Sequence, residues 1–286
     1  LVPIQLAVSV NARQGAVRLL DLSGNLLSSR ELPPEWANPP LDAAATPDGA
    51  LLVLARKLED RTAHGLLRLD LSRGGETVAP LPPGVNPDGV AAAPDGGAYL
   101  LDATAHLVHH VARDGRPLAT FGGRGPGRGS FNEPRALEGG VGGQVLVLDH
   151  GNRQVQRLDR DGTYLNRYSF RLKADSADLR TLDGAALGSD GSVYVSDANG
   201  SRIRTVRPDG SQGQTYQVTH LSGDDPAALL EIAVDPEGNV FAARRGGHLI
   251  RRYAPDGRLT ATIDAYAQVL SLSIAVVSDP APSRAG

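Results

Sequence analysis

Residues 91–101 read Ala-Ala-Ala-Pro-Asp-Gly-Gly-Ala-Tyr-Leu-Leu, which is a small-residue run, a turn and an apolar run. Two such runs separated by Asp-Gly indicate a β-hairpin, because glycine tolerates the backbone conformation that tight turns require. The same unit recurs at intervals of 47 or 48 residues, with turn glycines at Gly49, Gly96, Gly143, Gly191 and Gly238. A regular period of this length indicates a repeat architecture.

A second series of glycine turns runs through the same repeats. These turns are Ser23-Gly24, Gly74-Gly75, Asp114-Gly115, Asp161-Gly162, Asp209-Gly210 and Asp256-Gly257. The second repeat is longer than the others because residues 57–64 form a predicted loop insertion. Each unit therefore has four short strands and two tight turns, which is the composition of one β-propeller blade.

The two ends of the chain supply one further blade. Residues 5–10, 16–22 and 26–32 are predicted as its second, third and fourth strands, and residues 270–277 as its first strand. Pairing these segments removes the sheet edges that would otherwise be exposed. The sequence therefore predicts an all-β, six-bladed β-propeller with four antiparallel strands per blade, closed by pairing the C-terminal strand with the N-terminal strands. Residues 1–279 form this single domain, and residues 280–286 are predicted to be a flexible tail.

The composition excludes several classes of function. With 29 basic and 32 acidic residues, the formal net charge is -3, which argues against nucleic acid as the main partner. No apolar run approaches the roughly 20 residues of a membrane-spanning helix. Cysteine is absent, so disulfides and thiolate sites are excluded. The many Ala, Gly and Pro residues, with Lys57 and Lys173 as the only lysines, indicate a GC-rich bacterial genome. Methionine is also absent, which either that codon bias or an oxidising compartment explains. Because the chain also starts at Leu1, we expect a processed extracytoplasmic protein that is periplasmic, cell-surface or secreted.

Two copies of an NHL-like repeat are present. The first starts with Phe121–Leu137 and continues with Val145–Leu158, the second includes Val193–Ile203, and the resemblance extends over roughly residues 85–260. The resemblance implies a propeller fold but says little about activity, because that fold hosts many functions.

The loops between blades break the repeat and carry the candidate partner-binding residues. These are Trp36, Asn38, Arg124, Arg128, Arg135 and Lys173. Trp36 is the only tryptophan, and it could contact a partner or lie flat over its own blade. No catalytic set is evident and no cofactor is expected. We therefore expect a binding or scaffolding module that engages a protein or other polymer through its loop face, as a subunit of a larger envelope assembly.

The alternative is a metal-dependent lactonase that resembles the gluconolactonase-type propellers. This chemistry needs oxygen ligands that hold calcium or another divalent cation on the propeller axis. Candidate ligands near the starts of first strands are Asn86, Asp88, Asp183 and Glu231. The Glu-Gly-Pro motif of that family's first blade is missing, however, and the corresponding segment 270–277 offers only serines.

Three aspartates that end successive second strands invite a different interpretation. Asp102, Asp149 and Asp197 could form a ring of carboxylates, but their repetition favours a structural role as acceptors of backbone N–H groups.

Overall fold

The structure is a computed structural model, and it describes part of the 286-residue chain. The described residues are 4–11, 15–36, 40–60, 62–70, 75–170, 182–197, 201–218, 230–266 and 268–276. The predicted tail, residues 280–286, lies outside them. Within the described residues, no helix combines the length and hydropathy that a bilayer crossing requires.

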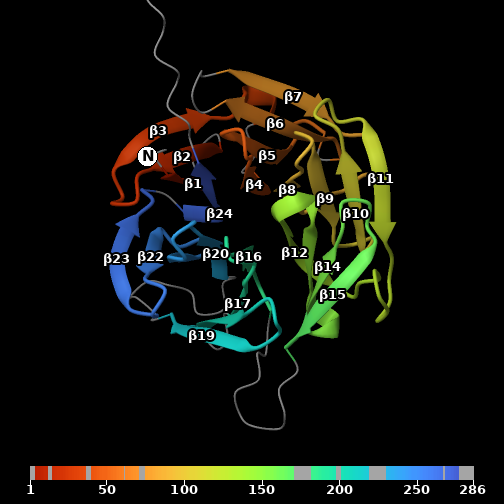
Figure 1. The fold of residues 1–286 in the computed structure, drawn as a ribbon. Helices are drawn as coiled ribbons and strands as arrows, with labels where there is room; N and C mark the ends of the chain where they lie inside the picture. The colour runs from red at the N-terminus through yellow and green to blue at the C-terminus, as the bar shows by residue number, and fades with distance from the viewer. Residues whose placement is uncertain are drawn as a thin grey trace, which may run out of the picture.

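The described strands form six antiparallel four-stranded sheets, and the protein is an all-β β-propeller (Figure 1). The sheet that contains both ends has the order β24 (Gln268–Val276), β1 (Ile4–Asn11), β2 (Ala16–Leu20) and β3 (Leu26–Glu31). The next consists of β4 (Asp42–Ala45), β5 (Ala50–Arg56), β6 (His64–Asp70) and β7 (Glu76–Pro80). It is followed by the sheet of β8 (Gly89–Ala92), β9 (Ala98–Asp102), β10 (Leu107–Val111) and β11 (Pro117–Gly122).

The second half of the chain repeats this plan. One sheet consists of β12 (Pro134–Gly139), β13 (Val145–Asp149), β14 (Gln154–Leu158) and β15 (Tyr164–Ser169). Another consists of β16 (Ala185–Leu187), β17 (Val193–Asp197), β18 (Arg202–Val206) and β19 (Gln212–Gln217). The last consists of β20 (Leu230–Val234), β21 (Val240–Arg244), β22 (Leu249–Tyr253) and β23 (Leu259–Asp264). Three short 3₁₀ helices lie between described strands: η1 (Pro34–Trp36), η2 (Val141–Gly143) and η3 (His150–Asn152).

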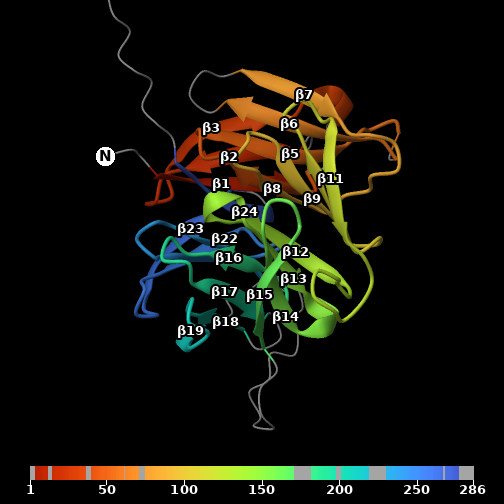
Figure 2. The same cartoon turned by 45° about the vertical axis from the view of Figure 1, so that its right-hand side comes forward.

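The two ends of the described chain share one sheet. β24 pairs with β1 in antiparallel register, with Leu6 opposite Ile274 and Ser9 opposite Ser271. The innermost strands also contact one another in the order β24, β4, β8, β12, β16, β20 and back to β24. Figure 1 shows these strands around a common axis, with β3, β7, β11, β15, β19 and β23 at the perimeter, and Figure 2 shows the same sheets turned by 45°.

The core lies between neighbouring sheets, because the second strand of each repeat presents apolar residues to both sides. All five residues of β9, β13, β17 and β21 are buried, as expected from their sequences. One cluster between the β8–β11 and β12–β15 sheets contains Tyr99, Phe131 and Val147. The Asp-Gly turns between strands follow the expected chemistry: Gly96 has a φ of 85°, and the carboxylate of Asp95 accepts the N–H of Gly97 at 2.9 Å.

Candidate functional site

A cavity of about 870 Å³ runs along the axis of the propeller. Its walls come from the innermost strands β4, β8, β12, β16 and β20 and from residues beside them. The small side chains of Ala44, Ala91 and Ala186 leave this space open, as the Ala- and Gly-rich first strands indicate. Cavities of this size accommodate small organic ligands in many proteins.

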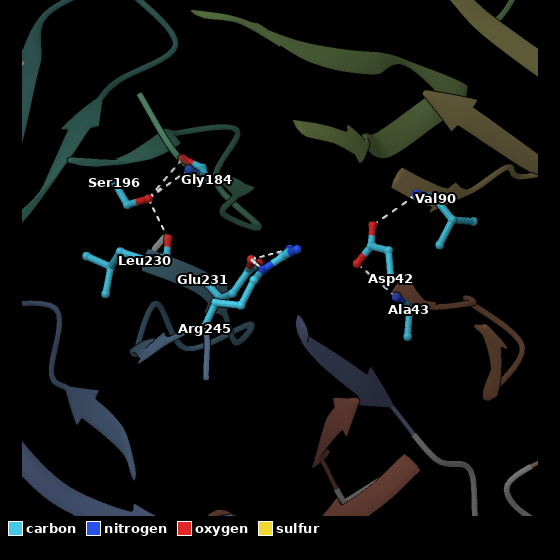
Figure 3. Close-up of polar contacts among 8 residues, drawn as sticks. All are labelled: Asp42, Ala43, Val90, Gly184, Ser196, Leu230, Glu231 and Arg245. Carbon is cyan, nitrogen blue, oxygen red and sulfur yellow. Dashed lines mark hydrogen bonds and ion pairs between the residues drawn. The ribbon is translucent and has the colours of Figure 1, made fainter. Parts of the chain in front are cut away.

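Three carboxyl groups enter this cavity from alternate sheets. Asp42 lies at the start of β4, Glu138 lies on β12, and Glu231 lies on β20. The two oxygens of Asp42 accept the N–H groups of Val90 at 2.9 Å and Ala43 at 2.8 Å. Glu231 accepts two hydrogen bonds from Arg245, at 3.0 Å from Nε and 2.7 Å from Nη2. Figure 3 shows the guanidinium group of Arg245 directed across the cavity toward Asp42.

A buried serine fixes the strand that carries Glu231. The hydroxyl of Ser196 donates to the carbonyl oxygen of Leu230 at 2.6 Å and accepts the N–H of Gly184 at 2.8 Å (Figure 3). Ser196 therefore joins the β16–β19 sheet to the first residue of β20. Because Glu231 follows Leu230 directly, this contact sets the position from which its side chain enters the cavity.

The carboxyl groups of Asp42 and Glu138 bind their protons more tightly than usual. Burial, and then repulsion by Glu231, raises the pKa of Asp42 from 3.8 to about 7, although the N–H groups of Val90 and Ala43 oppose this rise. Burial, and then repulsion by Asp42, raises the pKa of Glu138 from 4.5 to about 8. Burial lowers the pKa of Arg245, but Glu231 and Asp42 more than offset this effect, so its net pKa lies above the usual value. The cavity therefore combines a fixed cation with two carboxyl groups that ionise near neutral pH.

The four candidate metal ligands of the lactonase interpretation have different partners. Asp183 forms an ion pair with Arg135 at 3.0 Å, and Glu231 forms one with Arg245 at 2.7 Å. Asp88 accepts the N–H of Ala103, and the N–H of Asn86 donates to Asp102. Among the described residues, no three His, Asp or Glu groups are placed to hold one metal ion. Asp88, Asp183 and Glu231 nevertheless line the same axial cavity, whereas Asn86 is not among its described lining residues, so the proposed metal ligand set stays a prediction.

Arg124 and Arg128 lie on the loop between β11 and β12, residues 123–133, which we call the arginine loop. Both side chains are exposed. The guanidinium carbon of Arg128 lies 5.4 Å from the centroid of the Tyr164 ring, a cation–π contact. Neither arginine forms an ion pair with a described residue.

Backbone contacts hold the arginine loop in one conformation. The N–H of Phe131 donates to the carbonyl of Gly123 at 2.8 Å, and the N–H of Gly125 donates to the carbonyl of Phe131 at 2.9 Å. The ring of Phe131 is fully buried between two sheets. From β14, the amide of Gln156 donates to the carbonyl of Ser130 at 2.6 Å and accepts the N–H of Gly129 at 2.9 Å. The loop therefore presents its two arginines from a preorganised backbone.

The carboxylate of Asp149, at the end of β13, also holds the arginine loop through hydrogen bonds. This buried carboxylate accepts the N–H of Asn132 at 2.7 Å and the side-chain amides of Asn152, Gln154 and Gln156. Asp102 accepts the N–H of Ala105 at 2.8 Å. For these two of the three repeated aspartates, the structural interpretation is confirmed.

Trp36 is not an exposed contact residue. Its side chain is 7% exposed and packs with Val17, Leu32 and Val53 between the first two sheets. The prediction that Trp36 binds a partner is therefore wrong. The alternative, a ring flat over its own blade, is correct only in that the ring is buried, because it packs between two sheets. Arg135 is exposed, and it is paired with Asp183. Asn38 and Lys173 lie outside the described residues.

The sequence interpretation did not single out Asp42, Glu138 or Arg245. A weak signal was present, because Asp42 and Glu138 are acidic residues in short segments rich in Ala and Gly, and small residues suit strands that converge on an axis. Arg245 had no comparable signal, because it follows the buried strand β21 in the sequence. Its side chain reaches the cavity only because of how the sheets are arranged in the folded protein.

Comparison with known proteins supports the repeat assignment in part. The chain is 28% identical over 169 residues to human NHL repeat-containing protein 3. It is similar to NHL-repeat proteins. The match covers 56% of this chain and 47% of the human protein, so the chain spans about half the length of the curated relatives that it matches. No protein-family model matches the chain.

Solved structures share the propeller fold at low sequence identity. A protein of unknown function from Bacteroides caccae superposes with a TM-score of 0.64 at 14% identity, covering 96% of this chain and 99% of that one. Virginiamycin B lyase from Staphylococcus aureus superposes with a TM-score of 0.54 at 14% identity, covering 91% of this chain and 74% of that one. These likenesses concern the fold alone.

Proposed function

We propose that this protein is a non-catalytic binding module of the NHL-repeat type, in which the six sheets act as the blades of one closed ring. The module engages an acidic segment of a protein or another acidic polymer through the arginine loop. The observation that supports this function most directly is the preorganised, exposed pair Arg124 and Arg128. A rigid backbone reduces the entropy lost on binding, so a loop of this kind suits recognition.

The charge of the loop determines the partner chemistry. Two exposed guanidinium groups without acidic partners among the described residues attract carboxylate or phosphate groups, and Arg favours planar, bidentate contacts with them. Association through exposed charges is screened by salt. We therefore expect binding that weakens as ionic strength rises.

The test compares two ends of the same sheet. Binding of poly-L-glutamate and of poly-L-lysine is measured by biolayer interferometry at 50 and 300 mM salt. The variant Arg124→Glu/Arg128→Glu changes the arginine loop, and the matched control Arg113→Glu/Arg116→Glu changes the exposed turn between β10 and β11, at the opposite end of that sheet. We expect salt-sensitive binding of poly-L-glutamate that falls at least tenfold in the loop variant and less than threefold in the control. Equal effects of the two variants, or no preference for poly-L-glutamate, would contradict the proposal.

We also propose an extracytoplasmic location, because the sequence contains neither Cys nor Met, the residues most easily oxidised. Fractionation of cells that express the full-length gene product tests this location, and recovery in the cytoplasmic fraction would refute it.

A further inference from the structure

The described lining of the axial cavity carries far more negative than positive charge. Its ionisable residues are six acids and two arginines: Asp42, Asp88, Glu138, Asp183, Glu231, Asp235, Arg135 and Arg245. Both arginines are committed to ion pairs, one with Asp183 and one with Glu231. The other four acidic side chains of this lining form no ion pair with a described residue.

These four acids, Asp42, Asp88, Glu138 and Asp235, differ in how many hydrogen bonds their carboxylate oxygens receive from the protein. Asp235 accepts the backbone N–H and the side-chain amide of Asn239, and Asp88 is exposed and accepts the N–H of Ala103. Asp42 receives one N–H on each oxygen, so each oxygen can accept a further donor. Glu138 lines the cavity and is repelled by the negative charge of Asp42, but it receives no hydrogen bond from any described residue.

Arg245 shows what chemistry suits this space. Its guanidinium group reaches into the cavity, is held by Glu231 through two nitrogens and points toward Asp42 (Figure 3). The protein thus already places one cation on one of the three carboxyl groups. No equivalent internal cation accompanies Glu138 among the described residues.

The rest of the wall is aliphatic. Leu137, Ile232 and Val234 line the cavity together with several alanines. Such a wall favours the hydrocarbon part of a ligand, since burial of apolar surface is favourable at roughly 25 cal/mol per Å². A space of about 870 Å³ also exceeds what a single metal ion fills.

We propose that the axial cavity binds a small aliphatic amine, most favourably a diamine, with its ammonium groups paired to Asp42 and Glu138 and its hydrocarbon chain against the aliphatic wall. This site is separate from the arginine loop, and it gives the propeller a small-molecule ligand in addition to its polymer partner. Each ammonium group supplies up to three N–H donors, which Glu138 lacks and Asp42 can accept.

Binding is coupled to proton release. Asp42 and Glu138 hold protons near neutral pH because burial, together with repulsion by Glu231 for Asp42 and by Asp42 for Glu138, raises their pKa values to about 7 and about 8. An ammonium ion favours the ionised carboxylate, so the amine expels protons when it binds. Glu231 and Arg245 also face Asp42, and they are paired with each other at 2.7 Å, so we expect them to leave Asp42 available to the amine. We therefore expect affinity to increase as the pH rises from 6 to 8.5.

The experiment is isothermal titration calorimetry of the purified protein with 1,5-diaminopentane at pH 8, with 1,5-pentanediol and glutarate as ligands of similar length. We expect saturable binding of the diamine alone. Glu138→Gln and Asp42→Asn should each weaken binding at least tenfold, whereas the matched control Glu76→Gln, an exposed residue of β7, should leave it within twofold. The measured enthalpy should vary with the ionisation enthalpy of the buffer, which reports the released protons.

Several outcomes would overturn this proposal. They are no saturation up to 10 mM diamine, unchanged affinity in folded Glu138→Gln, tighter binding of glutarate, or displacement of the diamine by millimolar Ca²⁺. Diamine binding should persist in Arg124→Glu/Arg128→Glu. The proposal for the axial cavity and the proposal for the arginine loop can therefore be tested separately.

Discussion

Replacing Glu138 with Gln should change how the stability of the protein depends on pH. Glu138 lies on β12 in the axial cavity, and burial followed by repulsion from Asp42 raises its pKa from 4.5 to about 8. In the unfolded chain this carboxyl group ionises freely at its usual pKa. The folded state therefore holds a proton that the unfolded state releases between about pH 4.5 and pH 8.

The sign and size of the effect follow from this difference. Wherever the folded state binds more protons than the unfolded state, the free energy of unfolding falls as pH rises. One pKa unit corresponds to about 1.4 kcal/mol, so the rise from 4.5 to about 8 sets an upper limit of about 5 kcal/mol. Because Glu138 lines a space large enough for water, we expect an actual loss of about 1–2 kcal/mol. The amide side chain introduced by Glu138→Gln cannot ionise, so the variant should avoid this loss.

The assay is urea unfolding of the wild type, Glu138→Gln and Glu76→Gln at pH 5.5, 7 and 8.5. The stability of Glu138→Gln relative to the wild type should increase by about 1–2 kcal/mol between the lowest and highest pH. Glu76 is exposed on β7, so Glu76→Gln should follow the wild type at each pH. Parallel pH profiles for Glu138→Gln and the wild type would refute the account of the axial carboxyl groups.

Two further predictions concern the propeller itself. In Gly65→Ala the new methyl group would lie 2.6 Å from the ring of Trp36, so we expect thermal denaturation to show that the free energy of unfolding falls by about 1–3 kcal/mol. The control Gly75→Ala, whose methyl group would meet no atom within 4 Å, should unfold as the wild type does. Equal melting temperatures of Gly65→Ala and the wild type would contradict the packing of Trp36. Deleting residues 268–286 removes β24 and exposes the edge of β1, so we expect aggregation and loss of cooperative unfolding. The control deletion of residues 277–286 should preserve both solubility and cooperativity. A stable, monomeric protein without residues 268–286 would disprove the role of the β24–β1 pairing.

The fold could be predicted from sequence because its signals are local. The Asp95-Gly96 turn and the buried strand β9 that follows it depend on neighbouring residues, and a spacing of 47 residues repeats them. The pairing of β24 with β1 was predictable for a different reason, since each end lacked what the other supplied.

The environment of single side chains could not be predicted in the same way. Trp36 lies in a proline-rich stretch, and nothing local indicates that Gly65, distant in sequence, leaves room for its ring. Asp183 and Glu231 looked like possible metal ligands because both begin first strands. Their actual partners are Arg135 on β12 and Arg245 just after β21, at positions that local patterns do not connect to them.

By itself, the sequence determined the repeat, the strands within each repeat, the buried faces and the turn chemistry, because hydrophobic periodicity and backbone preferences act over a few residues. Only the tertiary structure decided which carboxyl groups face the axis, which arginines neutralise them and which arginines stay exposed at the surface. The physical reason is that electrostatic interaction and desolvation depend on distances between sheets, and those distances are set when strands remote in sequence surround one cavity.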